Sequence, residues 1–113
     1  MPTTVNLLHK FRRRLKRLKR KYPAVTQEVS RLVTELENDL RPGVKLTGFG
    51  FDLYKVRLPN PSARRGKSGG FRVVYYVQFA DLIHLVTIYS KTDESDVGAY
   101  AVQGILAEIG DID

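Results

Sequence analysis

The residues best suited to chemistry in this chain are cations that alternate with apolar residues on predicted strands. Lys55 and Arg57 are two positions apart in segment 53–58 (LYKVRL), so their side chains leave the same face of a strand. Arg72 comes early in the next predicted strand, 71–79. If these strands pair as antiparallel neighbours, Arg57 and Arg72 lie near each other. Converging cations repel one another, so the pattern favours a phosphate-binding site over edge-strand charges that deter aggregation.

A basic loop joins these two predicted strands. Segment 59–70 (PNPSARRGKSGG) is rich in Pro and Gly, which predicts a loop. Its cations Arg64, Arg65 and Lys67 are predicted to contact RNA. The loop matches neither a Walker nor a dinucleotide-binding pattern.

Two further candidates stand at the end of the last predicted strand, 82–90. Tyr89 is predicted either to donate a proton to a substrate or to stack on a nucleic-acid base. Lys91, two residues later, is the alternative proton donor. His84 shares its face with apolar residues and is predicted to belong to the core. The chain has no cysteine and no cluster of metal-ligand residue types. We therefore expect no disulfide, no metal and no cofactor.

Charge is distributed unevenly along the 113 residues. The net charge is +7, and segment 10–21 (KFRRRLKRLKRK) holds nine basic residues and no acid. Such a segment indicates either a nucleic-acid partner or a solvated helix face. We predict that it contacts RNA, through Arg12, Arg13, Lys16 and Arg17.

No segment approaches the roughly 20 apolar residues that cross a bilayer, and the N-terminus lacks the apolar core of a signal peptide. The expectation is therefore a cytoplasmic protein without a membrane partner.

Hydrophobic periodicity indicates one domain, 1–113. A helical stripe over 8–21 ends at Pro23, and a second, starting at Thr26, ends at Pro42-Gly43. Residues 3–6 suggest a short strand, and acidic residues after Thr92 suggest a third helix ending near Ile109. These patterns predict an α+β fold: an N-terminal helix hairpin packed on a small antiparallel sheet, with a C-terminal helix.

Three segments together carry a resemblance to a known family. LYKVRL, GKSGGFRVVYYV and LVTIYSKTDESDV resemble the RelE/ParE superfamily of toxins from type II toxin–antitoxin systems, in its RelE/HigB-like branch. The resemblance covers most of the chain. It implies a RelE-like fold and a ribosome-dependent, metal-independent endoribonuclease that cleaves mRNA by 2′-hydroxyl attack. It also implies a cognate antitoxin as partner, beside the ribosome and mRNA.

The resemblance also assigns roles to particular residues. The family's paired strand cations match Lys55 and Arg57, its central arginine matches Arg72, and its lysine after the last strand matches Lys91. Thr92 stands where the family has a further arginine, and Gly98 stands where RelE itself has a catalytic tyrosine.

Two other functions stay open at this point. One is a ParE-like inhibitor that binds DNA gyrase without cutting anything, and the other is a basic RNA- or ribosome-binding module without catalysis. The convergent cations Lys55, Arg57 and Arg72 favour the nuclease, because binding gyrase needs no phosphate site.

Overall fold

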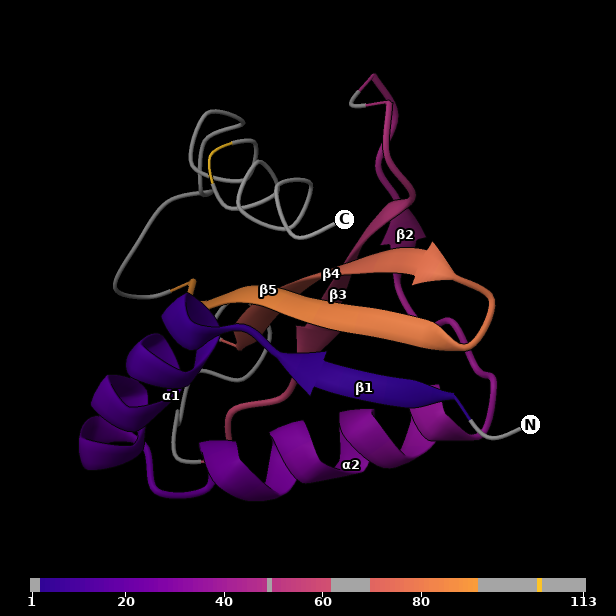
Figure 1. Cartoon of the computed structure of the whole chain (residues 1–113). Helices are drawn as coiled ribbons and strands as arrows, with labels where there is room; N and C mark the ends of the chain where they lie inside the picture. Colours follow the sequence, from indigo (N-terminus) through magenta and orange to yellow (C-terminus); the bar gives the residue numbers. More distant parts are fainter. Residues whose placement is uncertain (1–2, 49, 62–69, 92–103, 105–113) are drawn as a thin grey trace.

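The computed structural model describes residues 3–48, 50–61, 70–91 and 104. Within them, the chain forms a five-stranded mixed sheet with two helices. The elements are β1 (Thr4–Leu7), α1 (His9–Lys21), α2 (Val25–Glu37), β2 (Val44–Lys45), β3 (Leu53–Leu58), β4 (Phe71–Phe79) and β5 (Leu82–Ser90). The strand order is β1-β5-β4-β3-β2. In Figure 1, α2 runs below one face of the sheet and α1 lies at one end.

The predicted fold class, with its small antiparallel sheet, was wrong. The sheet is larger and mixed, because β1 pairs with β5 in parallel, from Thr4 opposite Leu82 to Leu7 opposite Leu85. β2 adds a fifth strand, with Val44 opposite Lys55. The expected C-terminal helix lies outside the described residues. The pairing of β1 was not predictable, because a four-residue strand does not reveal its partner or direction.

α1 forms because its apolar residues share one side of the helix. Phe11 is fully buried, and Leu15 and Leu18 pack against the core beside it. The last turn holds Lys19, Arg20 and Lys21, whose charges interact favourably with the negative end of the helix dipole. The helix ends at Lys21. The amide of its C-cap residue Tyr22 donates to the Leu18 carbonyl, and Pro23 follows. α1 is therefore held to the core by its apolar seam.

The main core lies between the helices and one face of the sheet. α2 contributes Val25, Val29, Leu32 and Leu36, all at least 96% buried. The sheet contributes Val56 and Leu58 from β3, Phe71, Val73 and Tyr75 from β4, and Ile83, Leu85 and Ile88 from β5. A second, smaller cluster of Leu53, Val74 and Val86 lies on the opposite face. Alternation along β3 and β4 thus separates a core face from a second face that also carries the cations.

A buried hydrogen bond fastens the chain between α2 and β2 to this core. The Tyr75 hydroxyl donates to the Pro42 carbonyl at 2.6 Å, and its ring stacks on that of Tyr54 at 5.1 Å. Burial raises the pKa of the Tyr75 hydroxyl well above its ordinary value. Gly43 follows at φ +94°, where an added Cβ would lie 2.4 Å from the Lys55 carbonyl oxygen. Only glycine therefore allows β2 to approach β3 so closely.

The buried side chain of His84 on β5 contacts Asn6 of β1. It is 7% exposed, its Nδ1 lies 3.0 Å from Asn6 Nδ2, and its Nε2 lies 2.6 Å from Gln78 Oε1. A neutral ring with its proton on Nε2 accepts from Asn6 and donates to Gln78. His84 is thus a buried structural residue that links β1 to β4.

Neither of the two helices in the described part of the chain has the length and apolar character of a membrane-spanning segment.

Candidate phosphate-binding site

Two arginines face each other at one end of the sheet. In the antiparallel pair of β3 and β4, Arg57 lies directly opposite Arg72, and on the next strand Tyr89 lies directly opposite Arg72. Directly opposite residues point to the same face, so the three side chains form a row across three strands. Like charges in this arrangement destabilise a sheet. An anion between them would reverse that effect, and the row is therefore the candidate site.

Gly70 brings the two guanidinium groups together. A Cβ placed on Gly70 would lie 3.2 Å from Arg72 Nη1 and 3.6 Å from Arg57 Nε. Both side chains therefore fold over the same point of the backbone. The same Cβ would lie 2.7 Å from the Leu58 carbonyl oxygen, a distance that real Cβ atoms essentially never show. Gly70 is the residue that lets both arginines and the end of β3 share this space.

Lys91 and Lys55 lie on either side of this row. The Lys91 amide donates to the Gly70 carbonyl at 2.9 Å, which places Lys91 at the same end of the sheet as Arg57 and Arg72. Lys55 is two residues before Arg57, so it shares that face at about 7 Å along the strand. Both lysines are partly exposed. The structure thus brings Arg57, Arg72, Tyr89 and Lys91 to one end of the sheet, with Lys55 next along it.

Tyr89 is 1% exposed, so its ring is not an open surface on which a base could stack. It lines a hollow between β5 and α1. Its neighbour Thr87, on the same face of β5, is equally buried. A role for the Tyr89 hydroxyl in proton transfer requires that this part of the site opens when substrate binds.

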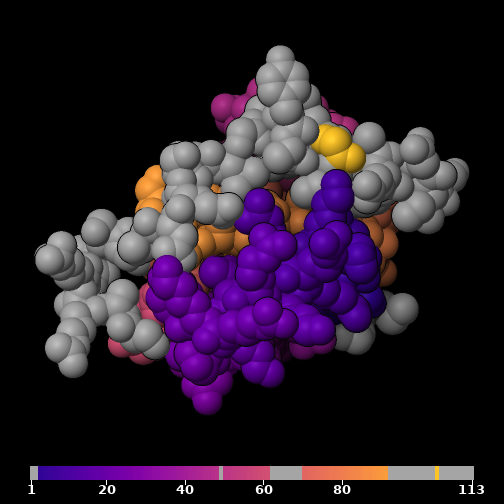
Figure 2. Space-filling model, turned by 90° about the vertical axis from the view of Figure 1, so that its left-hand side faces the viewer, coloured from indigo at the N-terminus to yellow at the C-terminus, as the bar shows by residue number. Residues whose placement is uncertain are grey.

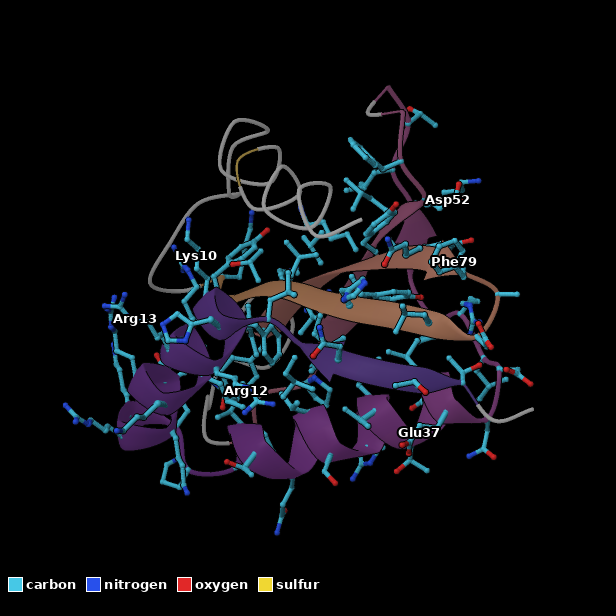
Figure 3. The ribbon with its side chains drawn as sticks, viewed as in Figure 1. Lys10, Arg12, Arg13, Glu37, Asp52 and Phe79 are labelled. Atoms are coloured by element: carbon cyan, nitrogen blue, oxygen red, sulfur yellow. The ribbon has the colours of Figure 1, made fainter. Side chains whose placement is uncertain are left out.

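The predicted RNA-binding residues fall into two groups. Arg64, Arg65 and Lys67 lie outside the described residues. Arg12, Arg13, Lys16 and Arg17 are exposed on α1, and Figure 3 shows Lys10 and Arg13 extending away from the helix. Two shallow surface hollows lie on α1, and every described residue that lines them is basic. One is lined by Arg13, Lys16, Arg17 and Arg20, and the other by Lys10, Arg13, Arg14 and Arg17. In Figure 2, α1 and α2 together form a broad surface.

Two carboxylates near Arg57 were missed by the sequence analysis. A hollow of about 180 Å³ between α2 and β3 is lined by Glu28, Glu35 and Arg57, among others. Glu28 is 6% exposed and accepts from Arg31 at 3.2 Å. One signal for it was available, because Glu28 stands three residues after Val25, on the apolar side of α2. No group of three residues suited to holding a metal ion occurs in the described part of the chain.

Comparison with known proteins adds no assignment to this geometry. No protein-family model matches the chain, and no curated protein matches it significantly.

Proposed function

We propose that the chain is a toxin of the RelE/HigB-like kind that cleaves mRNA on the ribosome. The observation that carries the proposal is the pair of Arg57 and Arg72, placed opposite each other and folded over Gly70. Two guanidinium groups in this position offer parallel N–H donors to the oxygens of one phosphate. A phosphodiester of RNA is the substrate class that such a pair fits.

The proposed reaction is transfer of the phosphoryl group to the neighbouring 2′-hydroxyl. A base removes the 2′-hydroxyl proton, the 2′-oxygen bonds to phosphorus, and the bond from phosphorus to the 5′-oxygen breaks. The leaving 5′-oxygen takes a proton, which gives a 2′,3′-cyclic phosphate and a 5′-hydroxyl end. Arg57 and Arg72 stabilise the extra negative charge of the pentavalent transition state. This reaction needs no metal ion, because these cations already neutralise the phosphate.

The neighbouring residues are proposed to complete the site. Lys55 is the candidate base, and Lys91 or Tyr89 is the candidate acid for the 5′-oxygen. No histidine, the commonest general base, stands among these residues, so correct placement of the substrate must provide much of the rate. The ribosome holds its mRNA in a fixed position and is therefore the proposed setting of the reaction.

The partners follow from the same proposal. The exposed cations of α1 would contact ribosomal RNA, and Arg64, Arg65 and Lys67 would contact the message. A cognate antitoxin with an acidic segment would cover the cationic surface, and the +7 chain would associate with it rapidly. The protein is proposed to act in the cytoplasm, where translation takes place.

Primer extension on mRNA from cells that express the chain tests the proposal. We expect defined cuts within translated reading frames and a rapid stop in protein synthesis. The Arg72→Ala protein should leave the same messages intact. Lys45→Ala, which removes a charge that pairs with Asp52 on the edge of the sheet, should cut as the parent does. Filamentation and DNA damage with uncut mRNA would instead identify a gyrase inhibitor. Ribosome binding with neither effect would identify a non-catalytic binding module.

A further inference from the structure

The chain between β2 and β3 carries an exposed aromatic ring. Phe51 stands two residues before β3, and its side chain is 42% exposed. Its ring centroid lies 5.6 Å from that of Tyr76 on β4, and the two ring planes meet at 85°. Tyr76 is itself partly exposed. The two rings form an aromatic corner, in which a flat ring that stacks on one wall presents its edge to the other.

Backbone hydrogen bonds hold Phe51 in place. The Leu53 amide donates to the Phe51 carbonyl at 3.0 Å, and the Val77 amide donates to the carbonyl of the next residue, Asp52, at 2.9 Å. Gly50 precedes the ring at φ +71°, a conformation that favours glycine, and no described atom lies within 4 Å of a Cβ placed there. Within the described chain, the ring therefore has a fixed position beside open space.

This aromatic corner lies on the face of the sheet that carries the arginine pair. Tyr76 is directly opposite Leu53, and Arg72 is directly opposite Arg57. Both pairs point to the same face, because even numbers of residues separate their members along β3 and along β4. The four positions from Arg72 to Tyr76 correspond to about 13 Å along the strand. A short stretch of single-stranded RNA spans that distance.

The surface between the two ends is cationic and accessible. Lys55 lies midway along β3, and its side chain is partly exposed. Val44 on the edge strand β2 lies directly opposite Lys55 and is 69% exposed. The outer part of this face is therefore open from the arginine pair to the aromatic corner, with one more positive charge on the way.

We propose that Phe51 and Tyr76 bind a base of the RNA strand whose phosphate lies between Arg57 and Arg72. The inference rests on the proposed function, in which RNA is the substrate. Phosphates alone would leave the aromatic corner unused, and an apolar protein surface would have to bury the charge of Lys55 beside it. Single-stranded RNA offers phosphates to the cations and flat rings to the aromatic residues.

Two anchor points of different chemistry would set how the message lies on the protein. The arginine pair holds a phosphate, and the aromatic corner holds a base a few nucleotides away along the strand. Only an unpaired base can enter the corner, because a base inside a duplex has neighbours on both of its flat sides. The corner therefore selects single-stranded RNA and fixes its register relative to the cut.

Fluorescence anisotropy with the full chain and a labelled 2′-O-methyl oligonucleotide tests the inference without ribosomes. This probe cannot be cleaved, because its 2′-oxygens are methylated. The comparison is an abasic oligonucleotide of the same length, which keeps the phosphates and lacks the bases. We expect the parent to bind the base-bearing probe about tenfold more tightly, the effect of one base stacked on an aromatic ring.

Variants at Phe51 locate the stacked base. Phe51→Leu keeps an apolar side chain without the ring, so it should bind the base-bearing probe about tenfold less tightly and the abasic probe as the parent does. Phe51→Trp should retain the preference for bases. Leu40→Ala is the control, because it removes an exposed apolar side chain between α2 and β2 and should leave both affinities unchanged. Arg72→Ala should weaken the binding of both probes by the same factor.

Three results would overturn the proposal. One is equal affinity of the parent for the two probes. Another is an equal loss for both probes in Phe51→Leu at an unchanged melting temperature. The third is unchanged RNA binding by Phe51→Leu together with loss of a concentration-dependent self-association of the parent, which would identify a contact between two copies of the chain. Failure of the parent to cut mRNA in cells would instead overturn the proposed function and leave the binding result unchanged.

Discussion

Arg57 and Arg72 lie directly opposite each other in the sheet, and both fold over Gly70. The arrangement places two permanent positive charges side by side without an acidic residue opposite either of them in the register of β3, β4 and β5. It costs stability in the free protein and becomes favourable when an anion binds.

Arg72→Ala should be the most damaging single change for activity. Loss of one transition-state donor lowers the rate by about 10²–10³. Arg72→Lys should recover little, because lysine keeps the charge without the paired donors of the guanidinium group. The measurements are growth arrest and mRNA cleavage, together with the melting temperature. An Arg72→Ala protein of unchanged melting temperature that still arrests growth as the parent does would remove the proposed site.

Gly70→Ala should disturb the site through the backbone. The added Cβ would meet the Leu58 carbonyl oxygen at 2.7 Å and Arg72 Nη1 at 3.2 Å. Overpacking of this kind costs about 1–3 kcal/mol of stability. Urea unfolding should show that loss, and cleavage should fall along with it. Gly104→Ala is the control, because Gly104 has no positive φ and no atom lies within 4 Å of its added Cβ. If cleavage by Gly70→Ala matches that by Gly104→Ala, Gly70 does not position the arginines.

Replacement of Arg13, Lys16 and Arg20 by glutamine should weaken ribosome binding and reduce its dependence on salt. All three are exposed and line one hollow on α1. Each phosphate contact that is lost should lower the slope of log affinity against log salt by about one. The fold should be retained, because Phe11, Leu15 and Leu18 are unchanged. An unaltered slope in a sedimentation assay across a salt series would show that α1 does not bind RNA.

Tyr75→Phe should destabilise the protein most clearly below pH 10. The variant loses the hydrogen bond to Pro42, a cost of about 1 kcal/mol. Burial raises the pKa of Tyr75 in the folded state, so above pH 10 the unfolded chain loses this proton while the folded chain keeps it. The stability of the parent therefore falls with pH, by up to about 1.4 kcal/mol per unit, and the variant lacks this contribution.

Urea unfolding of both proteins at pH 8 and pH 11 measures this effect, since the other tyrosines are common to both. The difference in their free energies of unfolding should shrink or change sign at pH 11. A difference that stays constant would show that the Tyr75 hydroxyl is not buried as described.

Periodicity in the sequence was sufficient to locate α1, α2 and the three long strands. The alternation in LYKVRL and the apolar stripe at Phe11, Leu15 and Leu18 each depend on residues close in the chain. Those patterns also place Arg57 and Arg72 near the ends of consecutive strands. Antiparallel pairing of the two strands was therefore enough to predict that the two arginines lie close together.

The rest depends on contacts between distant residues. Nothing local to Thr4–Leu7 indicates a parallel partner 78 positions away, and the two-residue β2 is too short to show alternation. The role of Gly70 was hidden for the same reason, because its neighbours Leu58 and Arg57 belong to another strand. Glu28 was missed because its burial depends on the packing of α2 against β3.

The parallel pairing of β1 with β5 also sets an order of events during synthesis. Asn6 finds His84 only across 78 residues of chain, and β5 is the last strand of the described sheet to be made. β1 therefore stays unpaired until residues 82–85 have left the ribosome. Contacts of such long sequence separation form slowly. Under the proposed function, the chain would therefore keep an incomplete sheet on the ribosome that makes it until residues 82–85 have emerged.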